Sequence, residues 1–185
     1  MFAPMSPAPR AAPSSVPVRR PLAGEIGDYY LGYVAGVQGD VLVALERGLA
    51  ETRALLERFG EARGTHRYAS GKWSVKEIVG HVIDAERVFS YRALRMARGD
   101  QTPLPGFEQD DFVAASGSDR RTLADLVAEL EHLRAANLVF FRSLEPAAWE
   151  RTGTASNNPF VVCAFPYIIA GHEAHHRRVL AERYL

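Results

Sequence analysis

Residues 73–100 read WSVKEIVGHVIDAERVFSYRALRMARGD, and this stretch decides the fold class. It opens with a capping box, in which the Ser74 hydroxyl can accept the backbone N–H of Glu77 and the Glu77 carboxylate can reach back to Ser74. Apolar side chains then recur at three- and four-residue steps, the pattern of a helix that packs on a core. We therefore predict a helix from Ser74 to about Gly99, with His81 in its second turn beside the apolar stripe.

Three further segments show helical periodicity, and no convincing strand alternation competes with them. They run from about Ile26 to Phe59, from about Thr122 to Leu144, and from Pro159 or Phe165 to Tyr184. Asn158 and Pro159 would form a cap and first-turn pair for the last helix. Pro166 must then either kink that helix or mark its true first turn, and the sequence leaves both open. The chain is predicted to be all-α.

Two segments fall outside these helices. Residues 1–22 are rich in proline, alanine and serine, so we expect a flexible, disordered tail there and a folded domain over residues 23–185. Residues 99–120 form a long crossover loop with two prolines. Long connections in compact domains are often functional, so this one either crosses the mouth of the helical bundle or serves as a plain crossover.

The amino-acid composition limits the classes of protein to which the chain can belong. The 185 residues are 47% hydrophobic and 24% charged, as in ordinary globular domains, and the formal net charge is zero. A neutral chain has no bulk attraction to nucleic acid or anionic lipid, and we expect neither as a partner. The single cysteine, Cys163, excludes an internal disulfide framework and a cysteine-rich zinc site. No apolar run approaches the ~18–20 residues that span a bilayer, and we expect a cytoplasmic protein.

Metal-binding chemistry is indicated by the histidines. The terminal segment GHEAHHRRVLAERYL, residues 171–185, places His172 and His176 four residues apart, hence on one helix face. Two imidazoles at that spacing can share a zinc-type ion. His81 is the best third ligand, because it lies on the strongly predicted helix and borders its apolar stripe. Clustered histidines near a chain end could instead be a solvated polar face. Three other histidines are expected to lie elsewhere: His66, His132 and His175.

A rival interpretation comes from the same segment. Residues 172–176 match H-E-x-x-H, the helix motif of zinc proteases, with Glu173 as the general base. Only nine residues follow His176, which leaves no room for the extended motif or for a downstream glutamate ligand. The protease interpretation is therefore the weaker one, and Glu173 stays a weak catalytic candidate.

Three segments together resemble the DinB-like superfamily: residues 73–100, PLPGFEQDDF at 103–112, and residues 171–185. The resemblance extends from about Tyr29 onward. This family includes YfiT-like metal hydrolases and the bacillithiol and mycothiol transferases. The resemblance implies a four-helix bundle, frequently a homodimer, in which three histidines bind nickel, zinc or a similar divalent ion. Those ligands map onto His81, His172 and His176.

Two classes of function follow. In the first, the chain is a metal-dependent enzyme, a thiol transferase or hydrolase acting on a small molecule, because three histidine ligands leave an open position for water or a thiol. In the second, it is a non-catalytic metal-bound or stress-related binding protein. An open position facing a pocket of ~300 Å³ or more would favour an enzyme.

Supporting roles can be assigned to a few more side chains. Asp84 and Glu86 follow His81 closely, so they either orient a ligand imidazole or form surface salt bridges with Arg87. The candidate substrate contacts are Glu173, Arg87 and Tyr91. Trp73 and Phe107 are expected to be core or loop anchors.

Overall fold

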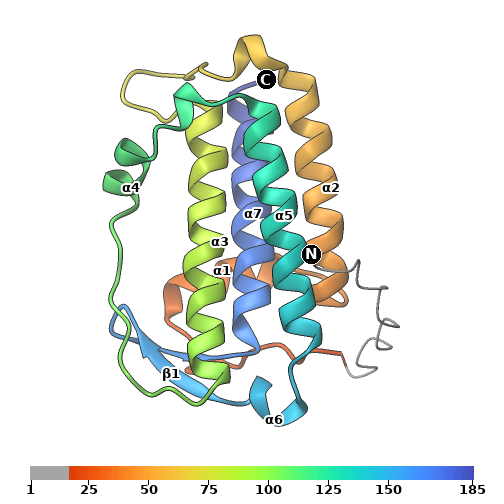
Figure 1. Ribbon diagram of the computed structural model, residues 1–185, viewed down its shortest axis with the longest axis vertical. Coiled ribbons are helices and arrows are strands. Elements are labelled where there is room, and N and C mark those ends of the chain that lie inside the picture. The colour runs from red at the N-terminus through yellow and green to blue at the C-terminus, as the bar shows by residue number, and fades with distance from the viewer. Residues whose placement is uncertain (1–16) are drawn as a thin grey trace, which may run out of the picture.

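The computed structural model describes residues 17–185, and four long helices dominate it (Figure 1). They are α2 (Val41–Phe59), α3 (Val75–Ala97), α5 (Leu123–Arg142) and α7 (Ala164–Arg183). The shorter helical elements are η1 (Asp28–Tyr30), α1 (Leu31–Gly36), η2 (Glu61–Arg63), α4 (Gln109–Ser116), η3 (Ser118–Arg120) and α6 (Pro146–Trp149). The predicted four-helix bundle is therefore confirmed. No helix in the described part of the chain is long and apolar enough to cross a membrane.

The start of α3 agrees in detail with the sequence. The Ser74 hydroxyl accepts the backbone N–H of Glu77 at 3.0 Å, and the Glu77 carboxylate accepts the backbone N–H of Ser74 at 2.9 Å. Both halves of the capping box are thus present. Because these bonds satisfy two donors that a helix N-terminus otherwise leaves free, they fix where α3 begins and where His81 falls on it.

The prediction of one continuous helix from Ile26 to Phe59 is wrong. The chain breaks after α1, and Gly39 has a φ of 73° before α2 begins. Asp40 caps α2 by accepting the backbone N–H groups of Leu42 and Val43 at 2.8 and 3.2 Å. The break lets α1 turn across the bundle and pack against α7, which a continuous helix could not do (Figure 1).

The structure contains a small β-sheet before α7, in a region where the sequence predicted no strand. Antiparallel strands β1 (Thr152–Ala155) and β2 (Asn158–Val161) form a hairpin at one end of the bundle (Figure 1). The two turn residues, Ser156 and Asn157, have φ of 49° and 59°, which suits the tight twist of a two-residue hairpin. Asn158 and Pro159 therefore lie in β2 and do not cap a helix. Pro166 lies in the first turn of α7, where its missing N–H costs no hydrogen bond.

The long connection after α3 is more ordered than a plain loop. Leu104 pairs with the hairpin, donating to the carbonyl of Thr154 and accepting from the backbone N–H of Ser156, both at 3.0 Å. Buried Arg92 donates to the carbonyl of Pro105 and to the Ser156 hydroxyl, both at 2.9 Å. These bonds anchor the connection at one end of the bundle, and α4 then packs beside α3 (Figure 1).

The predicted tail, residues 1–22, lies mostly outside the described residues. Its last residues, from 17 onward, contact the domain. Arg19 pairs with Glu25 at 2.8 Å and with Glu150 at 2.6 Å, and the carbonyl of Val18 accepts the Tyr167 hydroxyl at 2.9 Å. The Arg20 guanidinium donates to the backbone carbonyls of Val34 and Val37 at the C-terminal end of α1.

The interior of the bundle has two apolar clusters. One gathers α1, the hairpin and the adjoining ends of the four long helices, and the other lies at the opposite end of the bundle. On α2, α5 and α7, buried polar residues lie between the segments that belong to the two clusters. On α3 they lie on either side of the boundary between the clusters. We call these residues the polar layer: Thr52, His81, Glu86, Arg134, Asn137, His172 and Glu173.

Candidate metal centre

Three imidazoles converge within the bundle. His81 comes from α3, and His172 and His176 come from successive turns of α7. The Nε2 atom of His172 lies 3.0 Å from that of His81 and 3.1 Å from that of His176. Within the described part of the chain, these three residues form the group whose ligand atoms could share one metal ion, all within 4.8 Å of one another.

Close helix packing brings the three rings together, and two glycines permit it. A Cβ on Gly171 would lie 2.2 Å from the backbone carbonyl oxygen of Tyr33, where α1 crosses α7. A Cβ on Gly80 would lie 2.2 Å from the Ser118 hydroxyl of η3. Each glycine directly precedes a histidine of the group, so neighbouring elements approach closely beside His81 and His172.

The chemistry of these donors fits a divalent ion. Ligand nitrogens around a tetrahedral ion at ~2.0–2.1 Å lie roughly 3.3 Å apart, close to the spacing of the Nε2 atoms. Burial lowers the pKa of His81 to about 4 and that of His176 to about 3, and lowers the pKa of His172 well below its usual value. The rings are therefore neutral at pH 7, the state that a metal ligand requires.

Two cavities open beside the histidines. The tyrosine cavity has a volume of about 240 Å³, and its wall includes Tyr29, Tyr30, Tyr33, Phe107, His81 and His172. The tryptophan cavity has a volume of about 310 Å³, and its wall includes Tyr68, Trp73, Lys72, Asp110, His175 and His176. The first turn of α4 contributes Gln109 to the tyrosine cavity and Asp110 to the tryptophan cavity, so it lies beside both.

Among the described residues, neither Asp84 nor Glu86 hydrogen-bonds to a histidine of the group. Glu86 accepts hydrogen bonds from Arg134 and Asn137 in the polar layer, so it is neither an imidazole partner nor part of a surface salt bridge. Asp84 is half-buried, and burial raises its pKa while the charge of Arg87 opposes that shift. The Nδ1 atom of His81 is buried and has no hydrogen-bond partner among the described residues.

Glu173 is also placed away from a catalytic role. It is 1% exposed, and it accepts hydrogen bonds from Thr52 at 2.8 Å and from Arg134 at 2.9 Å. A carboxylate held in this way is not free to activate water as the general base of an H-E-x-x-H protease would. The structure therefore gives the protease interpretation no support.

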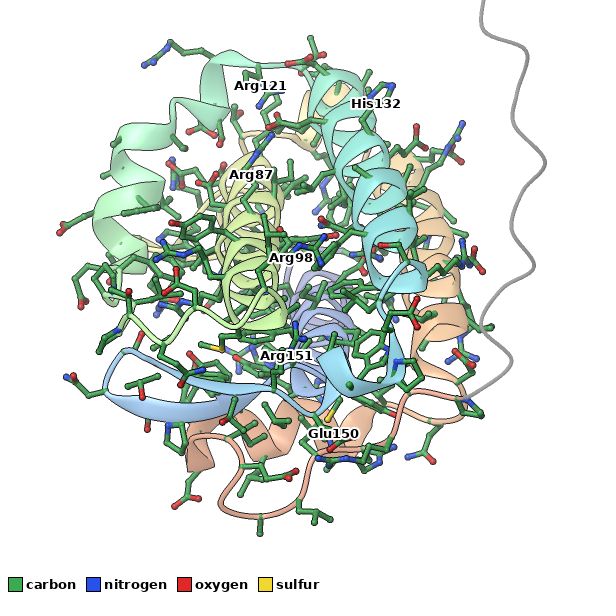
Figure 2. The ribbon with its side chains drawn as sticks, turned by 60° about the horizontal axis from the view of Figure 1, so that its bottom comes forward. Arg87, Arg98, Arg121, His132, Glu150 and Arg151 are labelled. Atoms are coloured by element: carbon green, nitrogen blue, oxygen red, sulfur yellow. The ribbon has the colours of Figure 1, made fainter. Side chains whose placement is uncertain are left out.

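The remaining candidates divide between the cavities and the surface. Arg87 on α3, labelled in Figure 2, forms an ion pair with Glu129 on α5 at 2.5 Å. Tyr91 and Arg87 line a third, apolar cavity whose wall includes no histidine. His132 is exposed on α5 (Figure 2), outside the site as expected.

Trp73 and Phe107, expected to be core or loop anchors, line the cavities beside the histidines. The Trp73 ring lies 4.8 Å from the His81 ring and forms part of the tryptophan cavity, and Phe107 lines the tyrosine cavity. Sequence reasoning missed the tyrosines of the tyrosine cavity and Asp110. The clustering of three tyrosines at positions 29, 30 and 33 was the available signal for the first.

Comparisons with known proteins agree with this architecture. The family model of the DinB superfamily matches residues 44–180. YfiT from Bacillus subtilis, described as a probable metal-dependent hydrolase with an unusual four-helix bundle topology, has a similar fold: the TM-score is 0.69 at 17% identity, over 77% of this chain and 82% of YfiT.

A second solved structure with the same kind of fold is a mycothiol-dependent maleylpyruvate isomerase. Its TM-score is 0.63 at 15% identity, over 75% of this chain but 58% of the isomerase. No curated protein sequence matches the chain. Identities this low establish the fold and not the reaction. The family match spans well over half of the residues and includes all three converging histidines, so the chain belongs to the DinB superfamily.

Proposed function

We propose that this chain is a metal-dependent enzyme that transfers a small thiol to a second small molecule, with His81, His172 and His176 holding one divalent ion. The observation that carries the proposal is the convergence of three Nε2 atoms beside two cavities. Three histidine ligands leave at least one coordination position for a substrate. Zinc and nickel both suit such a nitrogen donor set.

The two cavities favour transfer over hydrolysis. A divalent ion bound here would act as a Lewis acid that stabilises a thiolate or polarises a substrate oxygen. Transfer needs room for two organic molecules near the histidines, whereas hydrolysis needs room for one and a water molecule. His81 and His172 line the tyrosine cavity, and His176 lines the tryptophan cavity, so each cavity reaches the site. Of these two cavities, the tryptophan cavity, at about 310 Å³, lies within the size range of small-molecule pockets, and the tyrosine cavity, at about 240 Å³, suits a smaller molecule.

Side chains of the cavities supply the remaining functions. Aromatic rings such as Tyr33, Trp73 and Phe107 line the cavities and would hold the substrates by apolar contact. Asp110 lines the tryptophan cavity together with His176, and its negative charge raises the pKa of His81 against the larger lowering caused by burial. We assign to Asp110 the acceptance of the proton that a thiol loses when it becomes a nucleophile.

The metal-binding part of the proposal is tested by elemental analysis of purified protein. We expect about one divalent ion per chain in the wild type, and a large loss in His81→Ala and in His176→Ala. His132→Ala is the matched control, because it removes an exposed histidine from another helix and should retain the ion. Stoichiometric metal in both site variants would show that the triad is wrong.

The reaction is tested by incubating metal-loaded protein with low-molecular-weight thiols and the electrophile monochlorobimane. We expect conjugation of at least one thiol that stops when the metal is removed and returns when it is restored. Absence of metal-dependent conjugation across the common thiols would contradict the transferase. Metal-dependent cleavage of ester or amide substrates would then indicate a hydrolase, and bound metal with neither activity would indicate a binding protein.

A further inference from the structure

A single guanidinium joins the four long helices inside the polar layer. Arg134 of α5 donates through Nε and Nη2 to the two carboxylate oxygens of Glu86 on α3, at 2.9 and 2.8 Å. Its Nη2 also donates to Glu173 on α7 at 2.9 Å, and its Nη1 donates to the carbonyl of Leu45 on α2 at 2.6 Å. We call Arg134, Glu86 and Glu173 the arginine clamp.

Neighbouring polar groups complete the clamp. Asn137 donates to Glu86 at 3.0 Å, and Thr52 donates to Glu173 at 2.8 Å. The three charged side chains of the clamp are at most 2% exposed. Each carboxylate is thus held by a guanidinium and by a second donor, which leaves little freedom for α3 or α7 to rotate about its own axis.

Stability alone does not account for so many buried charges. Removing ions from water costs several kcal/mol each, and apolar side chains of similar volume often replace a buried ion cluster without loss of stability. Here the clamp lies where two apolar clusters of the core meet. A cluster with that cost is better explained by the geometry that it imposes.

That geometry concerns the histidines directly. Glu173 is the residue after His172 on α7, about 100° around the helix. Glu86 is five residues after His81 on α3, about 140° around it. Fixing both carboxylates on one guanidinium therefore fixes the rotation of both helices, and with it the directions in which His81 and His172 point.

We propose that Arg134, Glu86 and Glu173 are positioning residues that set the geometry of the three-histidine site, an inference that rests on the metal binding proposed above. They do not touch the metal or the substrate. Their effect is to hold α3 and α7 at the rotation where the Nε2 atoms meet. The proposal predicts that metal affinity and protein stability respond differently when the clamp is replaced.

The decisive variant is the triple replacement Glu86→Leu, Arg134→Met and Glu173→Leu, which removes every charge of the clamp together. We expect the metal-free triple variant to have a urea midpoint equal to or above that of the wild type. We expect its zinc affinity, measured by competition with a chromophoric chelator, to fall about 10- to 100-fold, as for other groups that orient metal ligands. Cobalt loaded in place of zinc should show a changed visible absorption spectrum.

Two further variants test the positioning role independently of the triple variant. Arg134→Lys retains one charge but cannot form paired bonds to a carboxylate, so it should weaken zinc binding even if the triple variant fails to fold. Arg142→Ala is the matched control, because Arg142 also lies on α5 and joins it to another long helix through Glu46 on α2, but this pair is partly exposed. Its loss should leave zinc affinity unchanged. An unchanged zinc affinity and cobalt spectrum in a folded triple variant or in Arg134→Lys would overturn the proposal. A wild type that binds no zinc would overturn the metal site itself, and the positioning role with it.

Discussion

Replacing Gly171 with alanine tests the close crossing that builds the site. The new Cβ would lie 2.2, 2.6 and 2.8 Å from the carbonyl oxygen, carbonyl carbon and Cα of Tyr33. All three atoms belong to backbone, so no side-chain rotation can relieve the clash. Helix α1 would have to withdraw from α7 by about 1 Å to restore ordinary contact.

Two opposing terms set the size of the effect. Alanine is the better helix former, by about 1 kcal/mol in a helix interior. Overpacking costs about 1–3 kcal/mol, and a clash with rigid backbone belongs at the upper end of that range. We therefore expect Gly171→Ala to lower the free energy of unfolding by about 2 kcal/mol.

The assay is urea unfolding of the metal-free protein, with Gly32→Ala as the matched control. A Cβ on Gly32 in α1 meets nothing within 4 Å, so that variant should be unchanged or slightly more stable. Withdrawal of α1 also moves Tyr33, whose ring centroid lies 5.5 Å from that of His172. If Gly171→Ala were as stable as Gly32→Ala, the tight crossing of α1 and α7 described here would be wrong.

Three other perturbations follow from the site and its helices. In the metal-free protein the pKa values of His81 and His176 lie at about 4 and about 3, whereas an unfolded chain protonates histidine near pH 6.5. The unfolded state thus binds more protons below that pH, so the urea midpoint should fall as pH drops from about 7 to about 4. The fall should be smaller in His81→Ala. If the urea midpoints of the wild type and His81→Ala changed equally with pH, the burial of the His81 ring would be contradicted. Asp110→Asn should retain zinc affinity but reduce the rate of thiol conjugation about 10²-fold or more, as expected for loss of a general base; an unchanged rate would remove Asp110 from the mechanism. Ser74→Ala should lower the free energy of unfolding by about 1–2 kcal/mol, because it removes a helix cap. Ser143 is exposed, so Ser143→Ala should change the free energy of unfolding little. Calorimetry of the two variants measures the difference.

Local signals in the sequence predicted the long helices and the meeting of the histidines. The capping box at Ser74 and the spacing of His172 and His176 depend on residues three or four positions apart, which one helix brings together whatever surrounds it. The choice of His81 as their neighbour needed a further assumption, that α3 and α7 are adjacent. The packing of those two helices makes that assumption correct. Binding of a metal by the three residues remains a prediction.

The hairpin was missed because its turn signal is weak. Turns of this type favour Asn-Gly or Asp-Gly, since both central residues need a positive φ, but this chain has Ser156 and Asn157 there. Pro159 further argued against a strand. Strand pairing nevertheless forms, because apolar residues of β2 such as Phe160 and Val161 are completely buried. Tertiary burial thus outweighed the local preference.

The roles of the acidic residues could not be predicted from local spacing. The sequence offers Glu86 as an imidazole partner or as part of a surface salt bridge with Arg87. It offers Glu173 as the general base of an H-E-x-x-H match or as a substrate contact. A helix points residues five or one apart toward different neighbours, and the true partner of both, Arg134, lies 48 and 39 positions away. Such a pairing depends on which helices pack together and at what rotation.

The site therefore differs from a metal centre in which each histidine is oriented by its own carboxylate. The Nδ1 atom of His81 has no hydrogen-bond partner among the described residues, so no such bond fixes its ring. Two other constraints act on it: the Trp73 ring at 4.8 Å, and the rotation of α3 that Arg134 sets through Glu86. Orientation is thus built into the helix that carries the ligand. Because Arg134 binds Glu86 and Glu173, the carboxylates that line the two cavities beside the histidines are Glu108 and Asp110, which come from the segment at the start of α4.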